Sequence, residues 1–124
     1  MSTHHVFIVD DDESVRTALC SLVRSIGLVP HTCASVDAFL AADGLAHADC
    51  IITDVHMPDI DGEQFQKCLA EKGCRTPLIV MTAFPDLGLR DRVMAAGAHC
   101  FLSKPFDAEE MIRCIERALQ IDTR

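Results

Sequence analysis

Five short apolar runs alternate along the chain with five helix-like segments, and this alternation limits the fold more than any other feature. The runs are His5–Val9, Val29–Cys33, Cys50–Thr53, Leu78–Thr82 and His99–Leu102. Most are apolar throughout, which is typical of parallel strands that are buried on both faces. Strict alternation of strands and helices implies right-handed crossovers. The pattern therefore predicts a three-layer α/β sandwich, in which a parallel five-stranded sheet has helices on both faces.

The segments between these runs have the spacing of amphipathic helices. We expect helices from about Glu13 to Ile26, from Ser35 to about Asp43, from Gly62 to Gly73, from about Asp86 to Ala96, and from Asp107 onward. Four of these helices end at or beside a glycine, which readily terminates a helix. Two strand orders are common for such a chain. In the flavodoxin-like order 2-1-3-4-5, ligands bind beyond the carboxyl ends of strands one and three.

Length and composition exclude several classes of protein. With 124 residues, the chain is expected to form a single domain over residues 1–124, with short tails at 1–4 and 121–124. No stretch approaches the roughly 20 apolar residues of a membrane span, and the first residues lack the features of a signal peptide. We therefore expect a soluble, cytoplasmic protein without a membrane partner. Seven cysteines without a Cys-x-x-Cys pair suggest neither a disulfide framework nor a zinc site.

The net charge of −8 argues against direct binding of nucleic acid by this domain, because contacts to phosphates need clustered Lys and Arg. The eleven basic residues are instead dispersed along the chain. If the protein acts on DNA, another domain or a partner must make the contact.

Carboxylates gather where two of the expected strands end. Asp10, Asp11 and Asp12 follow the first apolar run, and Asp54 follows the third. Neighbouring like charges repel and raise each other's proton affinity unless a cation joins them, and oxygen ligands alone favour a hard ion such as Mg²⁺. A simpler interpretation is also open for each cluster, because Asp is common in turns and caps helices.

The residues expected at this edge suit one type of chemistry. Thr82 ends the fourth run and Lys104 follows the fifth, so a hydroxyl and an ammonium group join the carboxylates. No glycine-rich phosphate loop follows the first run, which disfavours nucleotide binding. A nucleophilic carboxylate, metal ligands, a hydroxyl donor and a cation are the groups needed to transfer a phosphoryl group to Asp.

Four motifs in this order resemble the receiver domains of two-component response regulators, and among them the FixJ-like receivers. The motifs are Ile8-Val9-Asp10-Asp11-Asp12-Glu13-Ser14-Val15-Arg16, Thr53-Asp54-Val55-His56-Met57-Pro58-Asp59-Ile60-Asp61-Gly62, Val80-Met81-Thr82-Ala83, and Ala96-Gly97-Ala98 continuing to Phe101-Leu102-Ser103-Lys104-Pro105-Phe106. The resemblance covers essentially the whole chain. It implies the flavodoxin-like (βα)5 fold with the strand order 2-1-3-4-5.

The resemblance also implies a role for each site residue. Asp54 would accept a phosphoryl group from the phosphohistidine of a sensor histidine kinase. Mg²⁺ would be bound by Asp11, Asp54 and the backbone carbonyl of His56, with Asp10 assisting through water. Thr82 and Lys104 would bind phosphoryl oxygens, Phe101 would be the aromatic switch residue, and the Lys104–Pro105 bond would be cis, as in similar receivers.

By the same analogy, phosphorylation would alter one face of the domain. This face comprises the helix from about Asp86, the strand His99–Leu102 and the helix from Asp107. A second copy of the chain or an output domain would bind there, and FixJ-like receivers usually precede a helix-turn-helix domain that binds DNA. The expected function is thus a phosphorylation-controlled switch in transcription regulation, which catalyses only its own phosphoryl transfer and dephosphorylation.

Some residues have a second interpretation. Lys104 could be an ordinary solubilising lysine, and Phe101 could be a core residue. Asp12 matches no ligand position and is expected, with Glu13, to stabilise the start of the first helix. His56 is expected to face solvent, although it could steer water or protons.

Two other functions are compatible with this fold. The first is an interaction module that works without phosphate, but such a module is expected to lack at least part of the acidic, hydroxyl and lysine set. The second is a Mg²⁺-dependent phosphohydrolase, which would need a second carboxylate soon after the nucleophile, where this chain has Val55-His56. Phe84 and Pro85 also depart from many FixJ-like receivers, since they add bulk and stiffness beside the expected phosphoryl site.

Overall fold

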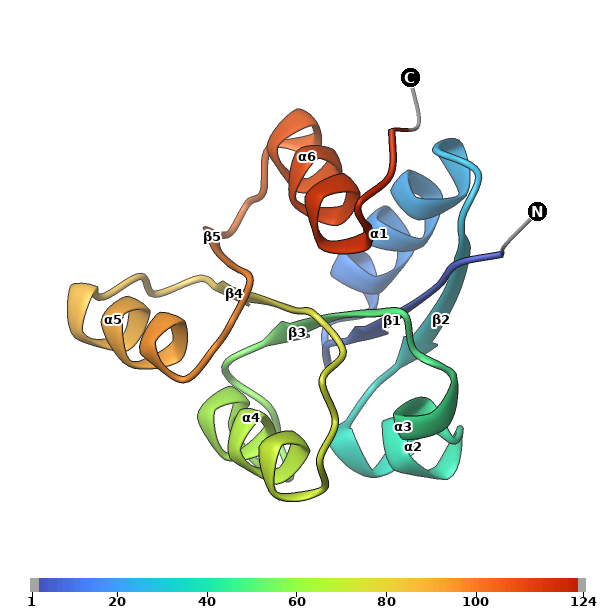
Figure 1. Ribbon diagram of the computed structural model, residues 1–124. Coiled ribbons are helices and arrows are strands. Elements are labelled where there is room, and N and C mark those ends of the chain that lie inside the picture. Colours follow the sequence, from blue (N-terminus) through green and yellow to red (C-terminus); the bar gives the residue numbers. More distant parts are fainter. Residues whose placement is uncertain (1–2, 123–124) are drawn as a thin grey trace.

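The structure, a computed structural model, describes residues 3–122 and has five parallel strands joined by helices (Figure 1). In chain order the elements are β1 (His5–Val9), α1 (Glu13–Ser25), β2 (Val29–Cys33), α2 (Val36–Ala41), α3 (Gly44–His47), β3 (Cys50–Asp54), α4 (Gly62–Glu71), β4 (Leu78–Thr82), α5 (Leu87–Ala95), β5 (Cys100–Ser103) and α6 (Ala108–Leu119). The strand order is β2-β1-β3-β4-β5. This confirms the predicted flavodoxin-like sandwich with its switch point between β1 and β3.

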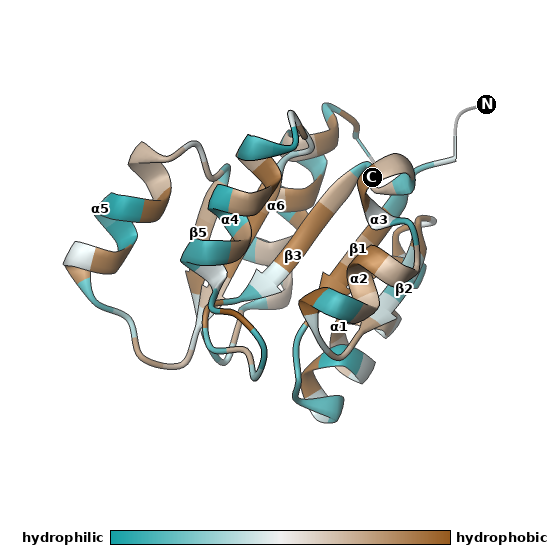
Figure 2. Cartoon of the chain, turned by 90° about the horizontal axis from the view of Figure 1, so that it is seen from below, coloured by the Kyte–Doolittle hydropathy of each residue, from teal (hydrophilic) through white to brown (hydrophobic). Residues whose placement is uncertain are grey.

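Helices cover both faces of the sheet, as Figure 1 shows. On one face, α1 and α6 pack through Leu19 and Ile115 against a cluster that includes Ile8 and Ile52. On the other face, α2, α4 and α5 bury a second cluster, in which the rings of Phe39 and Phe65 meet edge to face. In Figure 2 the visible strands are mostly hydrophobic, whereas the helices carry hydrophilic residues along their length. Burial on both faces explains why the central strands β1, β3 and β4 are mostly apolar, whereas the edge strand β2 is only partly buried and carries His31 and Thr32.

The register of the strands places four chain segments at one edge of the sheet. Val9 pairs with Cys33 on one side and with Thr53 on the other. Asp54 pairs with Met81, and Thr82 pairs with Ser103. The residues that follow β1, β3, β4 and β5 therefore emerge together at the carboxyl edge.

The second expected helix ends earlier than predicted. It was expected to reach about Asp43, but α2 ends at Ala41 and Asp43 adopts the left-handed conformation with φ 61°. The chain then forms the short helix α3 from Gly44. Gly44 lies against the ring of Phe39, where a side chain on this residue would collide with the ring. Packing around Phe39 therefore separates α3 from α2.

Other boundaries differ by one or two residues, as at α4, which ends at Glu71 instead of Gly73. The fifth strand begins at Cys100 instead of His99 and extends to Ser103. Of the two expected tails, residues 1–2 and 123–124 lie outside the described residues. Among residues 3–122, none of the helices has the length and apolar character needed to cross a bilayer.

Candidate functional site

Two buried carboxylates at the carboxyl edge are bridged by one lysine. Asp10 is fully buried and Asp54 is 5% exposed. Nζ of Lys104 lies 2.8 Å from Oδ2 of Asp10 and 3.1 Å from Oδ2 of Asp54. Burial lowers the pKa of Lys104, but the hydrogen bonds and charges of the two carboxylates outweigh this effect and raise the pKa above its ordinary value. Lys104 is therefore held in its charged form at the centre of the site.

The environment of Asp10 favours a cation. Burial raises the pKa of its carboxyl group, and the hydrogen bonds and charge of Lys104 oppose this shift only in part. Oδ1 accepts a hydrogen bond from the backbone N–H of Asp12 at 2.9 Å. Oδ2 contacts Lys104 but accepts no hydrogen bond of good geometry from a described residue. An additional positive charge beside Oδ2 would offset the cost of burying it.

Three carboxylates are close enough to share one metal ion. Asp10, Asp11 and Asp54 each have an oxygen within 4.8 Å of the others, and Asp11 opens to solvent. Within the described residues, this is the one group of His, Cys, Asp or Glu that could hold an ion in this way. The ligand atoms are all oxygens, which Mg²⁺ and Ca²⁺ prefer. The residues present therefore fit a hard divalent cation.

Thr82 and Lys104 are joined through the backbone. Thr82 is fully buried, and its Oγ1 accepts a hydrogen bond from the N–H of Phe84 at 3.0 Å. The N–H of Lys104 donates to the carbonyl of Thr82 at 2.8 Å. The peptide bond between Lys104 and Pro105 is cis. Thr82 and Lys104 thus lie at the ends of neighbouring strands that are held in register, and the ammonium group of Lys104 contacts the carboxylates.

The loop after β3 is fixed where it leaves Asp54. The N–H of Gly62 donates to the carbonyl of Val55 at 2.7 Å. A Cβ on Gly62 would lie only 2.8 Å from Cα of Val55, so the close approach requires glycine at this position. Asp61 and Gln64 then form a reciprocal capping box at the start of α4. These contacts hold the loop that carries His56, whose N–H donates to Oδ1 of Asp54 at 3.3 Å.

Asp59 and Arg16 also support the site, and the sequence did not reveal either of them. The Asp59 carboxylate accepts hydrogen bonds from the N–H groups of Val36 and Asp37, at 3.4 and 3.0 Å, and so ties the loop to the start of α2. Arg16 donates from its guanidinium to the carbonyl of Asp10 at 2.8 Å. Both contacts join segments far apart in the chain, and Asp59 looks in sequence like any Asp in a turn.

The structure places the remaining candidates around the rim. Asp12 caps α1 by accepting from the N–H of Ser14 at 2.8 Å, which agrees with its expected role at the start of the first helix. Phe101 is half-buried on β5 and packs against the second core cluster. His56 is exposed, and its ring meets that of Phe84 edge to face, with 5.6 Å between centroids. Phe84 is itself 72% exposed.

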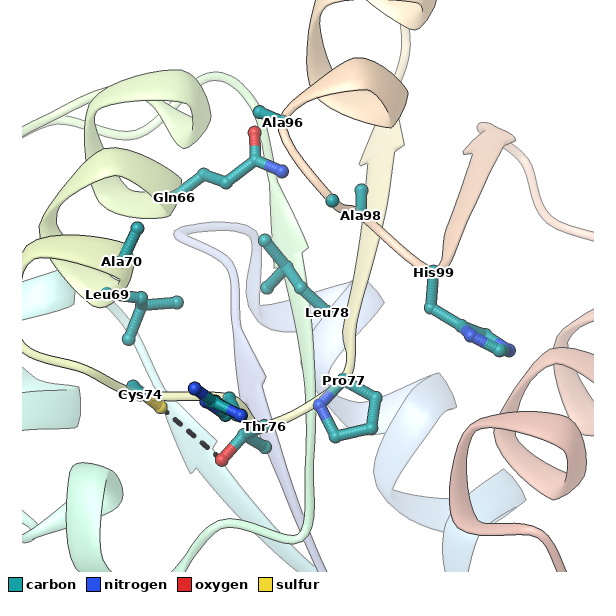
Figure 3. A pocket seen from close by; sticks show the side chains of 12 residues that line it. Gln66, Leu69, Ala70, Cys74, Thr76, Pro77, Leu78, Ala96, Ala98 and His99 are labelled. Carbon is teal, nitrogen blue, oxygen red and sulfur yellow. Dashed lines mark hydrogen bonds between the residues drawn. The ribbon is translucent and has the colours of Figure 1, made fainter.

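A second hollow lies at the opposite edge of the sheet (Figure 3). It has a volume of about 390 Å³ and is lined by residues near the starts of β4 and β5, such as Leu78 and His99, and by Gln66 on α4. In Figure 3, Cys74 contacts Thr76 at its rim, where Sγ and Oγ1 are 3.4 Å apart. None of the described residues that line it carries a carboxylate. Among the described residues, the carboxylates that could hold a cation lie instead at the carboxyl edge.

Comparison with known proteins identifies the family. The family model described as "Response regulator receiver domain" matches residues 6–116. The chain belongs to this family. The match spans all four motifs and every site residue named above, so the carboxylates, Thr82 and Lys104 lie within the receiver domain of a two-component response regulator.

Individual relatives are similar to this receiver domain over most of its length. The response regulator protein TmoT of Ectopseudomonas mendocina is 40% identical over 94% of this chain and 53% of that protein. The transcriptional regulatory protein FixJ of Azorhizobium caulinodans is 40% identical over 92% of this chain and 54% of that protein. The chain therefore spans about half the length of these curated relatives.

Solved structures have the same fold. The crystal structure of FixJ-N superimposes with a TM-score of 0.85 and 34% identity, and the match covers 97% of this chain and 96% of that chain. The response regulator StyR superimposes with a TM-score of 0.88 and 35% identity over 96% of this chain and 60% of that chain. These matches confirm the predicted FixJ-like receiver fold.

Proposed function

We propose that this receiver domain is a phosphorylation-controlled switch whose phosphoacceptor is Asp54. The observation that carries the proposal is the ammonium group of Lys104, which lies within 3.1 Å of both buried carboxylates, Asp10 and Asp54. Thr82 ends the adjacent strand, and Asp11 completes the acidic group. A nucleophilic carboxylate beside a fixed cation and a hydroxyl is the arrangement that phosphoryl transfer to Asp requires.

We further propose that Mg²⁺ is the cofactor of this reaction. Asp11, Asp54 and the backbone carbonyl of His56 would hold the ion, and Asp10 would assist through water. The buried Oδ2 of Asp10, which has an ion pair with Lys104 but no hydrogen bond of good geometry from a described residue, and the all-oxygen ligand set support this assignment. When bound, the ion would neutralise negative charge on the transferring phosphoryl oxygens.

The residues of the chain would divide the chemistry among them. A carboxylate oxygen of Asp54 attacks phosphorus, a new P–O bond forms, and the bond from phosphorus to the donor's imidazole nitrogen breaks with its electron pair. Lys104 pairs with one phosphoryl oxygen, and Thr82 donates a hydrogen bond to another. To do so, the Thr82 hydroxyl turns toward the site from the position in which it accepts from the N–H of Phe84. Most of the rate gain would come from positioning and charge stabilisation.

The partners follow from this reaction. The phosphohistidine of a cytoplasmic sensor histidine kinase would supply the phosphoryl group. The altered surface would comprise α5, β5 and α6, and Phe101 on β5 would be its aromatic switch residue. A second copy of the domain or an output domain would bind there, and contact with DNA would be made by the output domain.

The proposal is tested with a small phosphodonor such as acetyl phosphate in the presence of Mg²⁺. The wild-type domain should gain one acid-labile phosphoryl group by intact mass, and Asp54→Asn should not. Asp43→Asn is the matched control, since Asp43 is exposed and Asn tolerates its left-handed conformation well. Labelling of Asp54→Asn at the wild-type rate would contradict the assignment.

The metal assignment needs a separate measurement. Asp11→Ala should lose both Mg²⁺ binding, followed by titration, and phosphorylation, while its fold is retained because Asp11 is exposed. Unchanged Mg²⁺ affinity in this variant would place the ion elsewhere. A phosphatase assay with small phosphate esters separates the switch from the phosphohydrolase alternative, which predicts sustained turnover.

The switch itself is tested with beryllofluoride and Mg²⁺, which mimic an aspartyl phosphate. Amide resonances from Thr82 through Phe106 should shift, including those distant from the ligand, because Thr82 and Lys104 gain charge-assisted bonds of order 1.5–3 kcal/mol each. Shifts confined to residues that touch the ligand would instead favour an interaction module that binds phosphate without switching.

A further inference from the structure

Two buried cysteines share one cation on the surface formed by β5 and α6. Cys100 lies on β5 and is 8% exposed, and Cys114 lies on α6 and is 2% exposed. A guanidinium nitrogen of Arg117 lies 3.9 Å from Sγ of Cys100 and 3.7 Å from Sγ of Cys114. The same nitrogen contacts both sulfurs, so the two thiols and the cation form one cluster.

The cluster can be reached by a small molecule. Both cysteines and Arg117 line a cavity of about 390 Å³. Arg90, Arg113 and Glu110 line the same cavity, so with Arg117 three cations and one carboxylate surround the sulfurs. A small neutral oxidant can therefore approach sulfurs that are too buried for a protein partner to touch.

The electrostatics favour a thiolate on Cys100. The hydrogen bond from Cys114 lowers the pKa of Cys100, burial opposes this shift, and Arg117 and His99 lower the pKa further. The pKa of Cys114 is raised by its contact with Cys100, so Cys100 is the thiol of the pair that ionises first. In contrast, burial raises the pKa of Cys50, in the same hydrophobic cluster, to about 12. Cys100 thus differs from an ordinary core cysteine.

We propose that Cys100 and Cys114 form a reversible oxidation site for peroxide-class oxidants, with Cys100 as the reacting thiol and Cys114 as the resolving thiol. The Cys100 thiolate attacks one peroxide oxygen, the O–O bond breaks, and the leaving oxygen departs as water after protonation. Sγ of Cys114 then attacks the sulfenic sulfur, its S–H proton leaves with the hydroxyl group as a second water, and an S–S bond forms. Two thiols are oxidised and one peroxide is reduced to two waters.

A bond between Cys100 and Cys114 would restrain one face of the domain. The bond would join β5 to α6 beside Phe101, which lines the same cavity. It would therefore restrain the face formed by α5, β5 and α6. The site does not depend on phosphoryl transfer, so its failure would leave the proposed function untouched, and the reverse also holds.

The experiment is peptide mapping of the reduced, full chain after treatment with hydrogen peroxide and alkylation of the remaining thiols. Trypsin places Cys100 in the peptide Val93–Arg113 and Cys114 in the peptide Cys114–Arg117. We expect these two peptides to be joined by a bond that dithiothreitol reverses, and Cys100 to be oxidised before Cys20, which is half-buried on α1.

Variants assign the roles. In Cys114→Ala, sulfenic acid on Cys100 should persist and be trapped by dimedone. Arg117→Gln should slow oxidation of Cys100 by about three- to tenfold, because the thiolate loses its cation. Circular dichroism checks the fold of each variant, and the wild-type peptide map decides even if a variant unfolds. Oxidation of Cys100 no faster than that of Cys20, or the absence of a link between the two peptides, would overturn the proposal.

Discussion

The ion pairs of Lys104 make a quantitative prediction about stability. Lys104→Met keeps an unbranched side chain of similar length but removes the ammonium group that lies 2.8 Å from Asp10 and 3.1 Å from Asp54. Two carboxylates that are almost fully buried are then left without this cation. Without Mg²⁺, we expect the variant to be folded but clearly less stable.

The loss of stability in Lys104→Met depends on how deeply the carboxylates of Asp10 and Asp54 are buried. Breaking a fully buried ion pair costs about 3–5 kcal/mol, and a hydrogen bond to a charged group contributes about 1.5–3 kcal/mol. The Lys104 side chain is 14% exposed and the site opens to solvent at Asp11, so the loss should not exceed the lower limit for a fully buried ion pair. We expect the free energy of unfolding to fall by about 2–3 kcal/mol, which lowers Tm by roughly 10 °C.

The assay is urea denaturation without Mg²⁺, with Lys67→Met as the control because Lys67 is exposed on α4. The pKa of Lys104 is raised in the folded state, so its contribution is complete below pH 10.5 and is lost as pH rises through the folded pKa. Burial raises the pKa of Asp10, so acidification protonates this carboxyl group. The difference in the free energy of unfolding between the wild type and Lys104→Met should then become smaller. Mg²⁺ should reduce this difference in the free energy of unfolding as well.

A double-mutant cycle tests the cause. Asp10→Asn removes the buried charge that Lys104 compensates, so Lys104→Met should cost less in that background by more than 1 kcal/mol, as coupled neighbours do. If Lys104→Met were as stable as the wild type without Mg²⁺, or if the two substitutions were additive, then the burial of these charges would not control the stability of the domain.

Three further predictions concern the surroundings of the site. Gly62→Ala should lower the free energy of unfolding by about 1–3 kcal/mol in urea denaturation, because its Cβ would collide with the backbone of Val55, whereas Gly88→Ala, which faces movable side chains, should be nearly neutral. Burial and neighbouring histidines lower the pKa of His31 in the folded state. The contribution of neutral His31 to the free energy of unfolding should therefore be complete above pH 6.5 and decrease as the pH falls below this value, which denaturation at a series of pH values measures. His31→Gln should remove this dependence on pH. Phe84→Ala removes an exposed ring beside the site and should shorten the lifetime of the aspartyl phosphate about two- to tenfold, measured by loss of label, with stability unchanged.

The sheet could be predicted because its strands carry a local signal. Runs such as Leu78–Thr82 are buried along their whole length, and the structure confirms them almost to the residue. The convergence of Asp10, Asp54 and Thr82 follows from the same reasoning, since the carboxyl ends of parallel strands share an edge. The exact end of α2 could not be predicted, because it depends on how Gly44 packs against Phe39, a contact that helix propensity does not describe.

Contacts between side chains that are distant in sequence also could not be predicted. His5 and His31 lie on neighbouring strands with 2.8 Å between ring nitrogens, although neither has a motif around it. Cys100 appears in sequence as one more small apolar residue of a strand. Only the packing of α6 brings Arg117 to it and changes its chemistry.

The two sides of the site are built with different rigidity, and this difference matters for a switch. The loop from Val55 to Asp61 is fixed by the close approach of Gly62, by a capping box and by the bonds of Asp59 to α2. In contrast, residues 83–88 after β4 are all exposed.

Burial of backbone and side chains sets the cost of local movement, so the exposed segment after Thr82 can move at less cost than the loop that holds the proposed metal ligands. A phosphoryl group on Asp54 would therefore leave the ligand geometry in place and displace the segment leading into α5. Gln66 on α4 donates to the carbonyl of Val93 at 2.9 Å within the core, which anchors the far part of α5. Movement at Thr82 is then expected to tilt α5 about this contact and so to change the face beside Phe101.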